Sequence, residues 1–237
     1  MVAKLTRGRI HYAWFVVAVA FLTMLAAAGV RSVPGILILP LENEFGWDRA
    51  VVSLAVSINL LLFGLWGPFA AAVMEKIGIR WMMASALATL AYAIVLTTRM
   101  TAPWQLNLLW GVVVGLGAGA MAGWVAATVS NRWFVKRRGL VVGLLTASNA
   151  TGQLAFLPLL ASIVVAVGWR SAVLLVAAVA ALVIPFVIIF MRDHPADIGL
   201  RPYGAPEDGY VAFHDARPCW QPVSPGAYNL SAGAALA

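Results

Sequence analysis

Arg31 is the charged residue that lies deepest in a long apolar stretch of this sequence, which extends from Tyr12 to Leu41. A stretch of about 20 apolar residues is long enough to cross a membrane as a helix. Inserting an arginine near the bilayer centre costs about 2.5 to 3.5 kcal/mol, so such a residue normally faces a polar cavity or a partner group. Arg31 is therefore a candidate binding residue.

Uncharged polar residues also interrupt the apolar stretches. Asn149 and Gln153 are separated by four residues, which places them on one face of a helix. Asn59 follows Ser53 and Ser57 in an earlier stretch. These side chains could line a polar pathway. The alternative is hydrogen bonding between helices, which contributes about 0.6 kcal/mol on average.

Groups that would support catalysis are missing from the interiors of the apolar stretches. These interiors contain no Asp or Glu, so no proton relay can be assembled there. The single cysteine, Cys219, and the histidines at positions 11, 194 and 214 offer no metal cluster. We therefore expect no enzyme activity, no catalytic residue, no metal site and no cofactor. The net charge of +7 does not indicate a nucleic-acid partner, because the cations lie in short loops beside apolar stretches.

Composition places these residues in a polytopic membrane protein embedded in the lipid bilayer. Hydrophobic residues make up 62% of the chain and charged residues 11%, against about 25% charged in soluble domains. The stretches are continuously apolar, without the alternation of a barrel strand, so the expected fold is all-α. Six transmembrane helices are predicted, at 12–40, 51–74, 81–98, 104–130, 139–167 and 170–191.

The basic residues predict the orientation of these helices. One side of the membrane receives Lys4, Arg7, Arg9, Lys76, Arg80, Arg132, Lys136, Arg137, Arg138 and Arg192. The other side receives Arg49, Arg99 and Arg170. By the positive-inside rule, both termini are cytoplasmic in a multi-pass protein of the plasma or inner membrane. Residues 1–192 should form the six-helix bundle, and 193–237 a cytoplasmic loop or irregular tail.

Several local features should shape the bundle. Asp48 could cap the second helix, and Gly46 supplies the bend before it. Pro34 would tend to kink the first helix close to Arg31. In the fourth helix, glycines recur at a spacing of four and should pack against the backbone of another helix. These glycines are Gly111, Gly115, Gly119 and Gly123.

The loop from Glu75 to Arg80 resembles the end of a signature motif of the major facilitator superfamily, where it works as a charge latch between helices at the cytoplasmic face. The match is partial, because Ala71 replaces the leading glycine and Glu75 the commoner aspartate. The segments 44–47, 132–139, 168–170 and 195–200 resemble the monocarboxylate and oxalate-formate branch. The resemblance implies a cytoplasmic gating motif made of Glu75, Lys76, Gly78, Arg80, Arg132, Arg137 and Arg138.

The resemblance also implies a function. The chain corresponds to the N-terminal six-helix half of a secondary transporter whose site lies between two halves. In the monocarboxylate branch, a cation on the first helix interacts with the anionic substrate, so Arg31 would bind the carboxylate of a small organic anion. Asn59, Asn149 and Gln153 would complete the substrate-binding residues. The alternative for Arg31 is a structural role, reaching the outer interface or pairing with Glu42.

A second half is expected in this family, and two explanations for the six-helix length remain open. The chain could be a half-length protein that pairs with another six-helix half or with itself as a homodimer. It could also be a truncated product whose tail after about Gly204 is foreign or read out of frame, which the irregular composition favours. The alternative functions are therefore a non-transporting membrane assembly subunit or an inactive truncated transporter.

Overall fold

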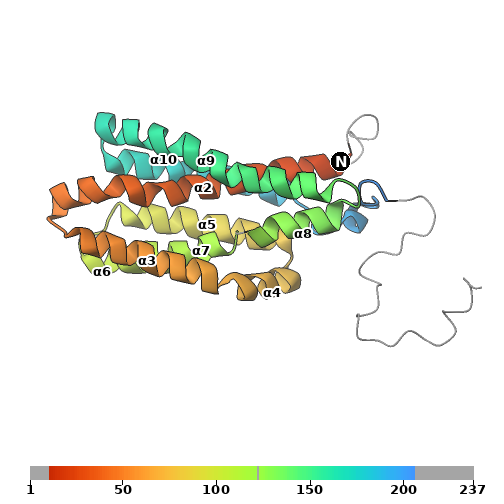
Figure 1. Cartoon of the computed structure of the whole chain (residues 1–237), viewed down its shortest axis with the longest axis horizontal. Coiled ribbons are helices and arrows are strands. Elements are labelled where there is room, and N and C mark those ends of the chain that lie inside the picture. Colours follow the sequence, from red (N-terminus) through yellow and green to blue (C-terminus); the bar gives the residue numbers. More distant parts are fainter. Residues whose placement is uncertain (1–10, 122, 206–237) are drawn as a thin grey trace, which may run out of the picture. The chain divides into compact units, whose positions relative to one another are not determined.

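A computed structural model describes residues 11–121 and 123–205. The chain divides into two units, residues 1–204 and 205–237, and the described helices all belong to the first of them. Its described secondary-structure elements are all helices, which confirms the all-α prediction (Figure 1). Of the predicted loop or tail at 193–237, the part from residue 206 onward lies outside the described residues.

The helices agree with the six predicted spans. The long elements are α2 (Tyr12–Phe45), α3 (Arg49–Leu65), α4 (Gly67–Ile77), α5 (Ile79–Thr97), α9 (Arg138–Val167) and α10 (Trp169–Phe190). The fourth span consists of α6 (Pro103–Leu106), the π-helix η1 (Asn107–Val114), α7 (Gly115–Gly119) and α8 (Gly123–Trp133). A short 3₁₀ helix, η2 (Pro195–Ile198), follows α10. Among the described residues, five helices can span a membrane, or six if α3 and α4 form one bent span.

Helix α2 continues past the predicted end at residue 40. It runs through Pro34 and Pro40 and ends at Phe45, where Gly46 takes the left-handed conformation with φ of 66°. The predicted bend at Gly46 is therefore confirmed. The predicted cap is also present, because the Asp48 carboxylate accepts from the Ala50 N–H at 3.4 Å. Glycine suits this turn because it adopts positive φ without a steric penalty.

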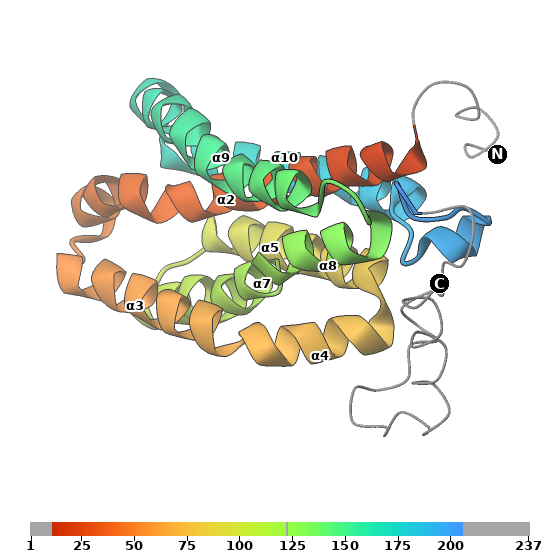
Figure 2. The same cartoon turned by 45° about the vertical axis from the view of Figure 1, so that its right-hand side comes forward.

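The second span is broken between α3 and α4, which are bent by 55° relative to each other (Figure 2). Pro68 lies in the first turn of α4. A proline fits the first turn of a helix but not its interior, so Pro68 favours a new helix start at this point. Gly67 packs against Trp124, and a Cβ there would lie 2.4 Å from the indole Cη2. A side chain at position 67 would therefore displace either the indole ring or the bend.

The glycines of the fourth span pack against α3. A Cβ at Gly115 would lie 3.1 Å from the Asn59 backbone, and one at Gly119 would lie 3.2 Å from the Phe63 carbonyl oxygen. A Cβ at Gly111 would lie 3.3 Å from the Ala55 carbonyl oxygen and 3.1 Å from the Ile58 side chain. The predicted backbone packing is confirmed for these three glycines. It is wrong for Gly123, which has no atom within 4 Å of its Cβ position, because the helix is interrupted before it.

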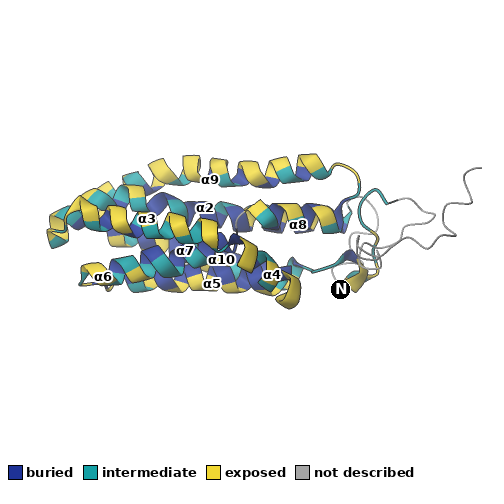
Figure 3. Ribbon diagram, turned by 60° about the horizontal axis from the view of Figure 1, so that its bottom comes forward, coloured by how far each residue is buried: buried dark blue, intermediate teal, exposed yellow. Residues whose placement is uncertain are grey.

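Exposure differs strongly between the helices. Helix α2 packs against both α9 and α10, and 67% of its most apolar 18-residue segment is buried. The corresponding segment of α9 is only 11% buried, and Figure 3 shows mostly exposed residues along this helix. Helix α9 therefore presents most of its surface outside the bundle formed by the described residues.

Helix α2 begins at the end of the bundle that carries Lys76, Arg80, Arg132, Arg137 and Arg138, and we call it the basic end. The segment after α10 packs there, since Tyr203 donates its N–H to the Trp133 carbonyl at 2.8 Å and its own carbonyl accepts from Val135 at 3.0 Å. The His11 ring contacts the Tyr203 ring, and its Nδ1 accepts from the Ala13 N–H at 3.2 Å. Burial lowers the pKa of His11, which favours the neutral ring that this acceptance requires.

Candidate functional site

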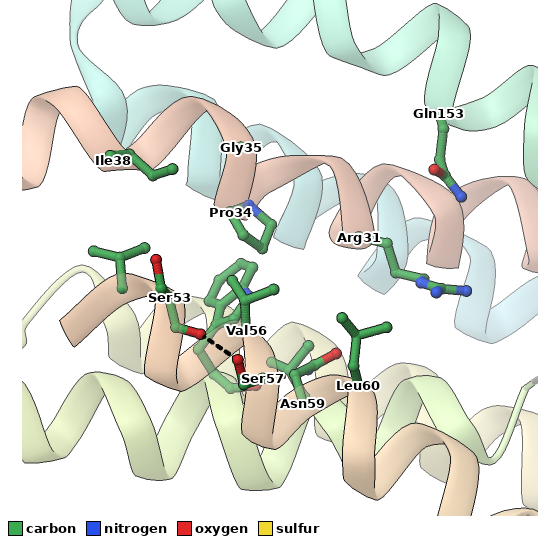
Figure 4. A pocket seen from close by; sticks show the side chains of 13 residues that line it. Arg31, Pro34, Gly35, Ile38, Ser53, Val56, Ser57, Asn59, Leu60 and Gln153 are labelled. Carbon is green, nitrogen blue, oxygen red and sulfur yellow. Dashed lines mark hydrogen bonds between the residues drawn. The ribbon is translucent and has the colours of Figure 1, made fainter. Parts of the chain in front are cut away.

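A cavity of about 480 Å³ lies among α2, α3, the fourth span and α9 (Figure 4). Its volume is within the range of small-molecule sites, about 300 to 1,000 Å³. The lining residues are Arg31, Pro34, Gly35, Ile38, Val52, Ser53, Val56, Ser57, Asn59, Leu60, Trp110, Val114 and Gln153. Arg31 is the charged residue among them. The other lining residues are apolar or carry uncharged polar side chains.

Arg31 occupies a central part of the longest helix. It lies 14 residues before Phe45, about 21 Å from that end of α2 at 1.5 Å per residue. Its side chain points away from Pro34 and Ile38, toward the basic end of α2 (Figure 4). This direction agrees with the tilt of helical side chains toward the N-terminus. Arg31 therefore extends along the interior of the bundle.

The guanidinium of Arg31 contacts an aromatic ring. Its Cζ lies over the Phe63 ring, 4.2 Å from the centroid. The ion pairs within the described ranges join Arg49 to Glu42 and Arg170 to Glu44, and neither includes Arg31. Glu42, the carboxylate considered as a structural partner for Arg31, binds Arg49 at 2.7 Å.

Asn59 links α3 to the π-helix. Its Nδ2 donates to the Trp110 carbonyl at 2.8 Å. π-helical turns often occur at functional sites, because they change which carbonyls are available. No described residue donates to Asn59 Oδ1, so this oxygen remains an available acceptor in a residue that lines the cavity.

Gln153 and Asn149 lie on α9, across from Arg31. Gln153 lines the cavity and points from α9 toward α2 (Figure 4). Its Nε2 donates to Asn149 Oδ1 at 3.0 Å. Asn149 is absent from the lining, so the cavity brings together Arg31, Asn59 and Gln153, with Asn149 one turn away.

The residues of the predicted gating motif lie at the basic end and form separate contacts. Gly78 separates α4 from α5 with φ of 90°, and a Cβ there would lie 2.6 Å from Asp193 Oδ1. The same carboxylate accepts from the Arg80 backbone N–H at 3.0 Å. Asp193 therefore binds the first turn of α5, where the helix dipole favours a negative charge. Sequence reasoning missed Asp193, because its partners are 113 residues away in the chain.

The remaining motif residues are spread around this contact. Arg138 Nε donates to the Phe134 carbonyl at 2.6 Å, and Arg137 adopts a left-handed φ of 65°. Glu75 and Lys76 are exposed, and Arg132 is half-buried in the last turn of α8. The described residues thus bring Gly78 and Arg80 together through Asp193, and they place the other motif residues nearby without an ion pair.

The sequence model of the Major Facilitator Superfamily matches residues 19–230. The chain belongs to the major facilitator superfamily. An uncharacterized MFS-type transporter, YcxA of Bacillus subtilis, is 24% identical over 77% of this chain and 45% of its own length. The oxalate:formate antiporter of Oxalobacter formigenes is 27% identical over 77% of this chain and 44% of its own length. Human monocarboxylate transporter 14 is 28% identical over 71% of this chain and 33% of its own length.

Membership of the major facilitator superfamily confirms several sequence predictions. The chain is an integral, multi-pass membrane protein of a transporter family, and its relatives include members of the monocarboxylate and oxalate-formate branch. Its helices correspond to one half of a major-facilitator fold. The chain spans less than half the length of the three relatives named above.

Removing the Asp193 carboxylate should destabilise this half of the major-facilitator fold. Loss of a side-chain acceptor at a helix N-terminus typically costs about 1 kcal/mol. Asp193→Ala should therefore lower the thermal unfolding midpoint of the purified protein in detergent by about 2 to 4 °C. Asp193→Asn keeps an acceptor oxygen and should lose less. Glu75→Ala removes an exposed carboxylate as a control, and equal midpoints for D193A and E75A would contradict the role of Asp193.

Proposed function

We propose that the chain forms one half of a secondary active transporter of small organic anions, with Arg31 as the carboxylate-binding group. The observation that carries this proposal is a lone arginine at a cavity of about 480 Å³ in a membrane protein. A guanidinium presents a planar fork that matches a carboxylate and stays charged at physiological pH. Relatives named as a monocarboxylate transporter and an oxalate:formate antiporter support an anionic substrate.

The amide side chains around Arg31 orient the substrate. Asn59 offers Oδ1 as an acceptor while its Nδ2 is held by Trp110. Gln153 approaches from α9, and Asn149 fixes its amide through a hydrogen bond of 3.0 Å. This arrangement suits an anion that carries a hydroxyl or another hydrogen-bond donor beside its carboxylate, because amide oxygens accept hydrogen bonds.

A second six-helix half, or a second copy of the chain, completes the binding site. The support is the presence of exposed polar side chains on two helices, Ser53 and Ser57 on α3 and Gln153 on α9. Polar side chains are disfavoured against lipid and normally face a bundle interior or a water-filled cavity. Alternating access would then be a rocking of the two halves around Arg31.

The basic end lies in the cytoplasm, with both termini on that side of a plasma or inner membrane. The support is the positive-inside rule, because the loops of this end carry most of the cations. At this end, a cytoplasmic gating motif works as a charge latch between helices, and its residues are Glu75, Lys76, Gly78, Arg80, Arg132, Arg137 and Arg138. The Asp193 carboxylate supports this motif where it binds the Arg80 N–H beside Gly78.

Uptake into proteoliposomes tests the proposed function. The protein in its full-length form would be reconstituted and given radiolabelled formate, oxalate, lactate or pyruvate, with and without a pH gradient. At least one carboxylate should accumulate above the level of protein-free liposomes, and the neutral analogue lactamide should not. Equal entry of lactate and lactamide would contradict the proposed selectivity for anions. No uptake of any of these carboxylates would contradict the proposal and favour a non-transporting assembly role.

A further inference from the structure

Phe63 lies beneath the charge of Arg31. It belongs to the last turn of α3, two residues before Leu65 and the 55° bend. The backbone of Phe63 is fixed by the fourth span, since a Cβ at Gly119 would lie 3.2 Å from its carbonyl oxygen and 3.3 Å from its Cα. The ring that contacts Arg31 is therefore attached to a closely packed backbone.

A ring face attracts a cation without occupying any of the hydrogen-bond donors of that cation. The negative face of the ring quadrupole attracts a guanidinium, most strongly when both are shielded from water. A guanidinium carries five N–H donors and no acceptor. None of the described residues accepts a hydrogen bond from Arg31, so a carboxylate would find these donors available. An acidic partner would instead occupy the donors and compete with the substrate.

We infer that Phe63 is a positioning residue for Arg31, holding the guanidinium over its ring before the anion arrives. This inference rests on the proposed function of Arg31. A free arginine side chain must lose rotamer freedom when it binds a ligand, and holding it in one pose beforehand reduces that loss. Phe63 therefore raises the affinity for the carboxylate although it does not line the cavity itself.

The aromatic residues of the next turns provide a matched control. Trp66 and Phe69 stack on each other with their ring centroids 5.9 Å apart, and they line a separate apolar pocket with Leu62, Leu65 and Leu116. Phe69 is exposed, and the cations of the described residues that lie over aromatic rings contact Phe63, Trp81 and Trp169 instead. Removing its ring should change packing on the same broken span without changing the surroundings of Arg31.

Carboxylate binding to the purified full-length protein tests the inference. The probes are radiolabelled formate, oxalate, lactate and pyruvate. Phe63→Leu should raise the Kd about tenfold, whereas Phe63→Tyr keeps a ring face and should bind within about twofold of the wild type. Phe69→Leu should also bind like the wild type.

The outcomes separate the two proposals. If the wild type binds none of the four carboxylates, or Arg31→Gln binds them normally, the proposed function fails. If Arg31→Gln abolishes binding while Phe63→Leu binds like the wild type, only the role of Phe63 is overturned. Equal losses in Phe63→Tyr and Phe63→Leu would also overturn it, because a general packing effect would then explain the loss. Thermal unfolding of each variant identifies any misfolded protein, and Phe63→Met then replaces a misfolded Phe63→Leu.

Discussion

Replacing Arg31 by glutamine is expected to reduce uptake of small carboxylates about 100-fold while the amount of protein in the membrane stays unchanged. Losing one partner of a desolvated charge pair typically costs 2 to 5 kcal/mol, which is about 30- to several-thousand-fold in affinity. Protein folding should tolerate the change, because Arg31 makes no ion pair with a described residue that would be left unpartnered. Uptake of radiolabelled lactate and formate by intact cells, normalised to membrane expression, provides the measurement.

Two further substitutions make the Arg31 result specific. Arg31→Lys keeps the charge but loses the planar fork, so it should retain intermediate uptake. Arg49→Gln removes a cation that is paired with Glu42 and whose side chain is 70% exposed, so it should leave uptake within about twofold. Normal uptake by Arg31→Gln would overturn the assignment of Arg31 as the carboxylate-binding group.

Replacing Gly152 by leucine is expected to destabilise the bundle. Gly152 lies where α9 crosses α2, and even a Cβ there would be 2.7 Å from Ala28 Cβ and 3.1 Å from the Leu25 carbonyl oxygen. Overpacking of this kind typically costs about 1 to 3 kcal/mol. The displaced helix also carries Gln153, so the cavity would lose one of its walls.

Gly143→Leu is the matched control for this crossing. Gly143 lies on the same helix, and nothing lies within 4 Å of its Cβ position. Leucine has a better helix propensity than glycine, so this variant should be as stable as the wild type or slightly more stable. Thermal unfolding in detergent, followed by size-exclusion chromatography, compares the two variants. Equal unfolding midpoints for G152L and G143L would contradict the tight packing of α9 on α2.

The sequence was sufficient to predict where the six spans lie, because a backbone in lipid must satisfy its own hydrogen bonds and apolar length then marks each span. It did not predict the break between α3 and α4 or the π-helix in the fourth span. The turn at Gly46 and the cap at Asp48 also depend on local chemistry, and both were predicted. The end of α2 at Phe45 was not. Apolarity falls off at Leu41, but the helix continues until Gly46 adopts a conformation that stops it.

Some residues of the candidate site could likewise be predicted from the sequence, and others could not. Arg31 was identified because a charge inside an apolar span is rare, and spacing alone placed Gln153 and Asn149 on one helix face. Phe63 carried no such signal, since it is one of ten phenylalanines in a largely apolar sequence. Its significance comes from contacts with α2 and α7, and Asp193 likewise depends on the fold. Contacts between distant segments leave no local pattern that a single sequence can reveal.

Competition binding tests the central claim, that Arg31 recognises a carboxylate, most directly. Purified full-length protein would bind radiolabelled lactate in detergent, with unlabelled lactate, pyruvate or lactamide as competitor. We predict that lactate and pyruvate displace the label, that lactamide does not, and that Arg31→Gln binds no label. Displacement by lactamide as effective as that by lactate, or unchanged binding in Arg31→Gln, would contradict the claim.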